Sequence, residues 1–210
     1  MKRTTMLLTL AAVAMAAVIS CDPYREEKIE TMFSGYMTGN TDSEGYVAVL
    51  TNDFGTQYMV REKSEKLVPD TTYRLVVSVA LDEDLTARII QMAPTISYRA
   101  PKDVIVPDSL RVKDPLEIIS YYIGGGYLNV NLGIKVSKED ARHRLLYTYK
   151  DSLGSPKFTI YHKAYGDEPV YTKHAYVSIP LYGYGLAKND TVFLSSNGYK
   201  EDYDYTLVFK

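Results

Sequence analysis

The sequence is poor in the side chains that form cross-links or hold metals. Its 210 residues include one cysteine, three histidines and no tryptophan. One cysteine cannot form an internal disulfide, and three histidines without a second cysteine leave too few ligands for a structural zinc site. With 46% hydrophobic and 24% charged residues, the chain can nevertheless bury a core. We therefore expect a globular fold that is stabilised by packing.

An excess of basic charge is also missing. The formal net charge is −2, and it becomes −4 without Lys2 and Arg3, which belong to a predicted export signal. This charge excludes the basic surface that a nucleic-acid partner would need. The longest apolar run, Met6 to Ile19, is shorter than the roughly 20 residues of a membrane-spanning helix, so we expect no transmembrane helix.

Residues 1–20 have the form of a signal peptide, with a basic head before that apolar run. The next feature, Val18-Ile19-Ser20-Cys21, resembles the bacterial lipobox, and the only cysteine of the chain occupies the position that receives the lipid. Diacylglycerol and an N-acyl chain on Cys21 would hold the protein on a membrane. The alternative is an ordinary secretory signal with a chance cysteine. Residues 21–28 would then form a polar tether.

Strand patterns fill the rest of the chain. Apolar residues alternate with polar ones between short polar turns, which predicts five antiparallel strands in residues 29–98 and a small OB-like β-barrel. Prolines weaken the alternation in residues 99–113, the predicted linker. Seven further strands in residues 114–210 indicate an antiparallel β-sandwich. The predicted strands are 29–38, 45–51, 55–61, 72–81, 85–93, 116–123, 127–134, 143–150, 157–164, 170–181, 191–195 and 203–210. A helix of one or two turns is expected only at Ser137 to Ala141.

Three segments of this all-β chain resemble the NigD-like lipoproteins of Bacteroidetes. They are Asp114-Pro115-Leu116, Gly124-Gly125-Gly126-Tyr127-Leu128-Asn129-Val130 and His162-Lys163-Ala164-Tyr165-Gly166-Asp167. The resemblance implies an N-terminal OB domain and a C-terminal β-sandwich. The family takes its name from a gene in a bacteriocin operon, and that location suggests an immunity role. No catalytic residues are attached to the family, so the resemblance implies no cofactor and no active site.

The resemblance also implies a location and a modification. Acidic residues after Cys21 resemble the surface-export signal of this phylum, although Pro23-Tyr24-Arg25 interrupts them. We expect an outer-membrane lipoprotein that faces outward, with a periplasm-facing orientation as the alternative. Motifs of the form Asp, then Ser or Thr, then an aliphatic residue or Thr predict O-glycans at Thr71, Ser109, Ser152 and Thr191; the alternative is that these are ordinary turn residues.

Several fragments imitate chemical sites. The segment Asn40 to Gly45 begins like a calcium loop, but Thr51 stands where a bidentate carboxylate is required, so we interpret it as a polar turn. Gly124 to Gly126 lack the Lys and Ser or Thr of a phosphate-binding loop, which favours a bulge or bend. His162 and His174 could face each other as half a metal site, but the pattern favours solvent-facing cross-strand residues.

No Gly-x-Ser-x-Gly motif is present, and the acids of Asp82-Glu83-Asp84 and Asp167-Glu168 are expected at solvated loop tips. The sequence therefore favours a non-enzymatic binding protein whose partner is another envelope component, a peptide toxin or a glycan. The alternative is a hydrolase with two carboxyl groups about 5 to 9.5 Å apart.

Tyrosine is the outstanding component, with 20 in the chain and 14 of them after residue 113. Tyrosine suits a half-buried strand, which is the simpler explanation. It is also enriched at binding sites because it combines rigid apolar area with a polar tip. Tyr121, Tyr122, Tyr182 and Tyr184 are the predicted ligand platform.

Overall fold

The fold was analysed in a computed structural model that describes residues 30–101, 107–152 and 154–210, and these contain twelve strands and one short 3-10 helix, η1 (Asp108–Leu110). Each predicted strand corresponds to one observed strand, which confirms the all-β class. The predictions for residues 1–29, including Cys21 and the tether, lie outside the described residues. In the described part, no helix is long and apolar enough to cross a membrane.

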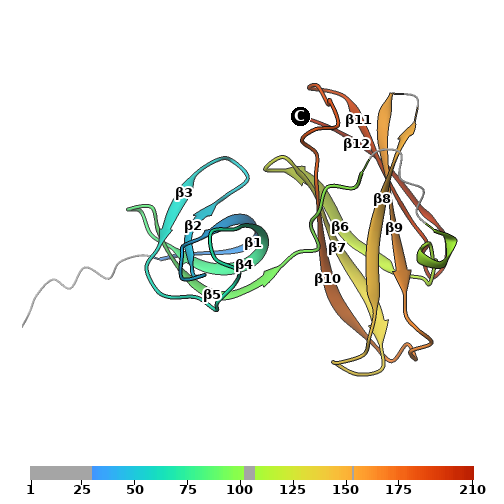
Figure 1. Ribbon diagram of the computed structural model, residues 1–210, viewed down its shortest axis with the longest axis horizontal. Helices are drawn as coiled ribbons and strands as arrows, with labels where there is room; N and C mark the ends of the chain where they lie inside the picture. Colours follow the sequence, from blue (N-terminus) through green and yellow to red (C-terminus); the bar gives the residue numbers. More distant parts are fainter. Residues whose placement is uncertain (1–29, 102–106, 153) are drawn as a thin grey trace, which may run out of the picture. The chain divides into compact units, whose positions relative to one another are not determined.

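The first five strands close into a barrel (Figure 1). They are β1 (Thr31–Thr41), β2 (Val47–Thr51), β3 (Gln57–Val60), β4 (Thr72–Leu81) and β5 (Thr86–Pro94), in the order β1-β2-β3-β5-β4. The long pairing of β1 with β4 closes the ring, and β3 runs parallel to β5. Alternate residues such as Met37, Leu50 and Leu75 point inward and are fully buried, as an amphipathic strand requires. The predicted OB-like barrel is therefore confirmed.

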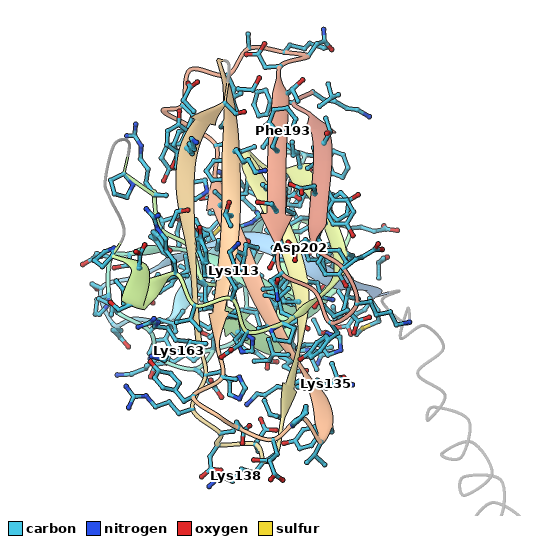
Figure 2. The ribbon with its side chains drawn as sticks, turned by 90° about the vertical axis from the view of Figure 1, so that its right-hand side faces the viewer. Lys113, Lys135, Lys138, Lys163, Phe193 and Asp202 are labelled. Carbon is cyan, nitrogen blue, oxygen red and sulfur yellow. The ribbon has the colours of Figure 1, made fainter. Side chains whose placement is uncertain are left out.

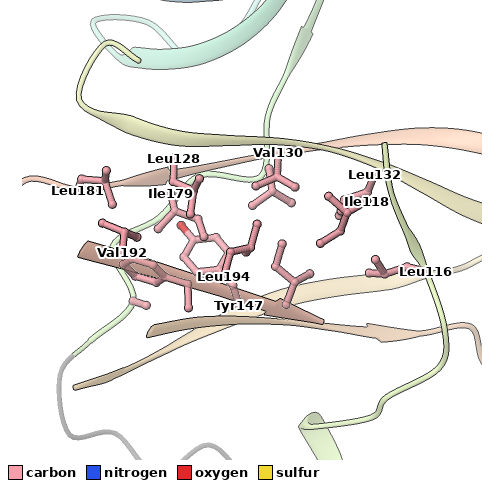
Figure 3. Packing of buried hydrophobic residues seen from close by; sticks show 14 of the residues in the cluster. Leu116, Ile118, Leu128, Val130, Leu132, Tyr147, Ile179, Leu181, Val192 and Leu194 are labelled. Carbon is pink, nitrogen blue, oxygen red and sulfur yellow. The ribbon is translucent and has the colours of Figure 1, made fainter. Parts of the chain in front are cut away.

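The remaining strands form two facing sheets. One sheet has the order β10-β7-β6, with β6 (Glu117–Gly124), β7 (Tyr127–Val136) and β10 (Tyr171–Pro180). The other has the order β12-β11-β9-β8, with β8 (Arg144–Ser152), β9 (Ser155–Lys163), β11 (Thr191–Ser196) and β12 (Tyr203–Val208). Figure 3 shows Leu128, Val130 and Leu132 of β7 facing Leu194 of β11 and Tyr147 of β8. This core confirms the predicted sandwich.

Two details differ from the prediction. β11 pairs with β9 in parallel, so the sandwich is not wholly antiparallel. The chain crosses to the other sheet for β10 and returns for β11, and two reversals of direction leave β11 parallel to β9. In addition, residues 137–141 form turns and no helix. The Ser137 backbone N–H and hydroxyl both donate to Asp167, so this serine does not cap a helix.

The segment after the barrel packs on the sandwich. Ile96 forms a parallel bridge with Val177 of β10, and its N–H donates to the Tyr176 carbonyl at 2.8 Å. Tyr98 stacks on Tyr147 with ring centroids 4.1 Å apart. Residues 31–210 consequently form one compact unit.

Candidate functional site

A buried arginine joins the barrel to the sandwich. Arg74, on β4, has a side chain that is only 1% exposed, and its Nη2 lies 2.5 Å from Oδ1 of Asp53 in the turn between β2 and β3. The same guanidinium donates to Oδ1 of Asn129 on β7, at 3.2 and 3.3 Å, and to Thr38 on β1. A buried charge is costly unless a counter-charge and hydrogen bonds compensate it, and this arrangement supplies both.

The partners of Arg74 are themselves held by the sandwich. Asp53 accepts a hydrogen bond from the Tyr122 hydroxyl on β6 at 3.0 Å. Asn129 accepts one from the Ser178 hydroxyl on β10 at 2.9 Å and is fully buried. The network therefore links β4, the β2–β3 turn and all three strands of one sheet.

The close approach of the Asp53 carboxylate explains the glycines at the start of the β6–β7 turn. A Cβ atom on Gly124 would lie 2.4 Å from Oδ2 of Asp53, and one on Gly125 would lie 2.5 Å from Oδ1. Gly125 and Gly126 have φ values of 60° and 82° and form the two-residue turn between β6 and β7. The segment is thus a hairpin bend, as the sequence favoured.

An aromatic cleft of about 870 Å³ lies beside this network. Its walls come from the start of β1, the β2–β3 turn, the β6–β7 hairpin and the residues after β12, and its rings belong to Phe33, Tyr36, Phe54, Tyr122 and Phe209. Phe54 at the tip of the β2–β3 turn is 95% exposed. Because it is concave and lined mainly by aromatic side chains, this cleft is the candidate ligand site.

Two tyrosine hydroxyls near the cleft keep their protons. Burial raises the pKa of Tyr36 far above its usual value, and burial together with the Asp53 carboxylate does the same for the pKa of Tyr122. Tyr122 donates to Asp53, whereas the buried Tyr36 hydroxyl has no hydrogen-bond partner among the described residues. The Tyr36 hydroxyl is therefore a buried polar group without a partner in the described part of the chain, and it is not exposed to the cleft.

The four predicted platform tyrosines do not share one surface. Tyr122 lines the cleft, and Tyr121 stacks on Tyr205 of β12 with ring centroids 4.3 Å apart. Tyr182 is 62% exposed after β10. Tyr184 is buried in the sandwich core, where its hydroxyl donates to the Ala100 carbonyl at 2.7 Å. Ligand binding by the tyrosines that reach the surface stays a prediction.

The histidine prediction needs a correction. His162 does not face solvent or His174: it is 2% exposed on β9, and its Nε2 lies 2.8 Å from Nδ1 of His143. His174 belongs to the other sheet and contacts Asn131. The sequence reasoning missed His143, because it immediately precedes β8 and neither alternation nor spacing indicates its partner.

The two histidine rings are hydrogen-bonded at both ends. His162 Nδ1 donates to the Pro115 carbonyl at 3.0 Å, and His143 Nε2 donates to the Asp167 carboxylate at 3.0 Å. With the contact between the rings, these bonds form a continuous chain from Pro115 to Asp167.

Burial lowers the pKa of His162, so the folded protein resists protonation of this ring. Hydrogen bonds from Ser137 and His143 hold the pKa of Asp167 well below its usual range. Asp114 accepts the Ala164 N–H at 2.8 Å and fastens the start of the sandwich to the end of β9. The cluster thus binds parts of the chain together.

The remaining predicted sites have local explanations. Asp42 accepts hydrogen bonds from the backbone N–H groups of Glu44 and Tyr46, so the calcium-like segment is a polar turn. Asp82 is not a solvated loop-tip acid: it is 6% exposed and pairs with Arg61 at 2.5 Å. In the described residues, no group of three or more His, Cys, Asp or Glu side chains is arranged to hold a metal.

Surface chemistry elsewhere is mixed. Figure 2 looks onto one side of the sandwich and shows the labelled lysines apart from one another, so these lysines do not form one basic patch: Lys113, Lys135, Lys138 and Lys163. Among the predicted glycan sites, Ser109 is exposed on η1, and Thr71, Ser152 and Thr191 are partly exposed. Glycosylation stays a prediction.

An OB-like barrel followed by a β-sandwich defines an all-β protein, and comparisons identify its family. The family model of the NigD-like C-terminal beta sandwich domain matches residues 105–209. The chain belongs to the NigD-like family. No curated protein matches the chain.

Solved structures share the whole fold at low sequence identity. A NigD-like immunity protein from Bacteroides caccae is 22% identical with a TM-score of 0.69, over 89% of this chain and 100% of that one. A protein from Parabacteroides distasonis, provisionally named toxin-related, is 16% identical with a TM-score of 0.66, over 86% and 94%. A protein from Bacteroides fragilis, provisionally named a lipoprotein, is 14% identical with a TM-score of 0.59, over 86% and 98%.

Replacing Asp53 tests the buried ion pair. Asp53→Asn keeps the shape but leaves the Arg74 charge buried without a counter-charge, and we expect the free energy of unfolding to fall by about 3–5 kcal/mol. The double variant Asp53→Asn/Arg74→Met removes both charges and should lose less than the single variant. Urea unfolding of the wild type, the single variant and the double variant measures these changes. A decrease in the free energy of unfolding of less than about 1 kcal/mol in Asp53→Asn would contradict the ion-pair account.

The histidine pair predicts sensitivity to acid. Because the folded pKa of His162 is below its unfolded value, the unfolded chain binds an additional proton below about pH 6.5. The free energy of unfolding should fall by about 1–2 kcal/mol between pH 7 and pH 5. Asp167 affects the free energy of unfolding only at lower pH. Its ionised carboxylate stabilises the folded protein because its folded pKa is lowered, and this contribution is lost well below about pH 4. In His162→Gln the free energy of unfolding should decrease less between pH 7 and pH 5. An unchanged decrease would show that other groups cause it.

Proposed function

We propose that this chain is an envelope-anchored, non-enzymatic lipoprotein that binds a polypeptide partner in its aromatic cleft. The carrying observation is the exposed Phe54 ring beside a hollow of about 870 Å³ that is lined by further aromatic rings. Large exposed apolar side chains grouped around a concave site mark interaction surfaces in soluble proteins.

The cleft is prepared for binding before a partner arrives. The Arg74–Asp53 pair fixes the base of the turn that carries Phe54, and the Asp53–Tyr122 hydrogen bond fixes the opposite wall. A wall that is already ordered loses little conformational freedom on binding, which favours affinity.

The same geometry supports binding over hydrolysis. Both oxygens of the Asp53 carboxylate are engaged, one by Arg74 and one by Tyr122. Asp82 and Asp84 both pair with Arg61, so each of these two carboxylates is already engaged. A glycosidase-like mechanism would need one acid that keeps its proton and one free carboxylate in the same cleft.

A polypeptide fits this cleft better than a glycan for two reasons. Most of the lining side chains are apolar, whereas sugar hydroxyls would need several free polar groups. The solved structures of similar fold include one named as an immunity protein and one provisionally named toxin-related. A protein toxin or another envelope protein is therefore the proposed partner class.

The anchoring part of the proposal rests on Cys21. Its lipobox context predicts lipid attachment, and one solved structure of similar fold is provisionally named a lipoprotein. We place the protein at the outer membrane, facing outward, with residues 21–28 as a tether.

Phe54→Ala tests the cleft. The probe is a library of random linear twelve-residue peptides displayed on phage and selected on the purified full chain. Selected peptides should carry aromatic or large aliphatic residues, and Phe54→Ala should weaken their binding by about 30-fold or more, the loss typical of a central aromatic contact. Tyr165→Ala, at an exposed aromatic outside the cleft, is the control. Binding to a glycan array without peptide binding would show that the proposed partner class is wrong.

Cys21→Ser tests the anchor. Without the thiol no lipid can be attached, so the variant should appear in the soluble fraction while the wild type fractionates with membranes. Protease added to whole cells should remove the wild type if it faces outward. A variant that stays with the membranes would refute lipid anchoring, and a protected wild type would refute the outward orientation.

A further inference from the structure

One edge of the three-stranded sheet is open next to the cleft. In the order β10-β7-β6, no described strand pairs with the outer side of β6. The opposite edge is covered by the chain itself, because Ile96 exchanges backbone hydrogen bonds with Tyr176 and Ser178 of β10. The fold thus covers one edge of this sheet and leaves β6 uncovered.

The register shows which backbone groups β6 presents. Gly124 and Tyr127 flank the two-residue turn and form a hydrogen-bonded pair. Pairs alternate in an antiparallel ladder, so Ile123, opposite Leu128, and Tyr121, opposite Val130, direct their N–H and C=O groups away from β7. Two residues therefore offer a template for another strand.

The composition of β6 does not prevent another strand from pairing with its open edge. Exposed edge strands usually carry lysine, proline or a bulge that prevents pairing. From Ile118 to Gly124 the strand has no charged residue and no proline, and its irregularity at Ile119 lies before the open part. Ile119 and Tyr122 are 42% and 41% exposed.

We propose that the polypeptide partner binds as an extended strand that pairs with β6 through Tyr121 and Ile123. This inference rests on the proposed function and specifies how the cleft is used. Side chains of an added strand alternate between the two faces of the sheet. On one face they meet Tyr122 and enter the aromatic cleft, and on the other they meet the stacked rings of Tyr121 and Tyr205. The backbone edge supplies hydrogen bonds, and the cleft selects an apolar side chain.

A second copy of this chain fits less well. If β6 paired with β6 of another copy through Tyr121 and Ile123, Tyr122 of each copy would lie opposite Tyr122 of the other, flanked by Ser120 and Gly124. The Tyr122 ring is held at its own cleft by the hydrogen bond to Asp53, and Ser120 and Gly124 are too small to fill an apolar hollow of about 870 Å³. The cleft therefore favours a different polypeptide with a large apolar residue at that position.

Hydrogen exchange at the backbone amides of β6 tests the strand pairing directly. Peptides selected from the phage library described above are added to the purified full chain, and amide hydrogen exchange is followed by NMR. Strand addition should slow exchange at Tyr121 and Ile123, while Tyr122, already bonded to β7, serves as the internal reference. Bound peptide without slower exchange at these two residues would overturn the inference.

A matched pair of variants tests the same point by affinity. Tyr121→Val and Tyr121→Pro both remove the ring, but only proline also removes the outward N–H. We expect the proline variant to bind peptide about tenfold more weakly than the valine variant. Urea unfolding of both variants shows whether they remain folded, and the exchange experiment decides the matter on the wild type if proline disrupts the sandwich.

The outcomes separate the inference from the proposed function. Suppose that Phe54→Ala abolishes peptide binding while Tyr121→Pro and Tyr121→Val bind peptide with equal affinity. The cleft then binds peptides without strand addition, and only the inference is wrong. If no selected peptide loses affinity in Phe54→Ala, the proposed function is wrong as well. A dimer in solution that is lost in Tyr121→Pro but retained in Tyr121→Val would assign the β6 edge to a second copy and overturn the inference.

Discussion

The structure depends on how the buried charge of Arg74 is compensated. A guanidinium that is 1% exposed needs a counter-charge and several acceptors, and here they come from Asp53 in the barrel and Asn129 in the sandwich. To reach Asp53, the β6–β7 hairpin must lack side chains at Gly124 and Gly125. One desolvated ion pair thus fixes the Phe54 turn, the Tyr122 wall and the shape of the cleft between them.

The segments that resemble the NigD-like family have structural roles. Asp114 fastens the start of the sandwich to Ala164, and His162 contacts His143. Asp167 accepts the hydrogen bond of His143 at the other end of the pair. These polar groups are engaged with one another, so the cluster stabilises the scaffold that presents the cleft and the β6 edge.

Alternation along the chain was sufficient to predict every strand, because one face of each strand packs on a core and the pattern is local. β7 shows this well: Leu128, Val130 and Leu132 are buried, as their spacing requires. Errors arose where a contact came from elsewhere. The hydroxyl of Ser137 bonds to Asp167 and caps no helix. Tyr184 resembles a surface tyrosine in sequence, yet it packs in the core.

The sequence by itself determined the class of fold, the positions of the strands along the chain, the family resemblance and the prediction of a lipid anchor, since each depends on neighbouring residues. Only the tertiary structure decided the partner of Arg74, the pairing of His143 with His162, the parallel pair of β9 and β11, and the location of the cleft. Arg74 and Asn129 are 55 residues apart. No local period encodes such a contact, because it exists only after separate strands have packed together.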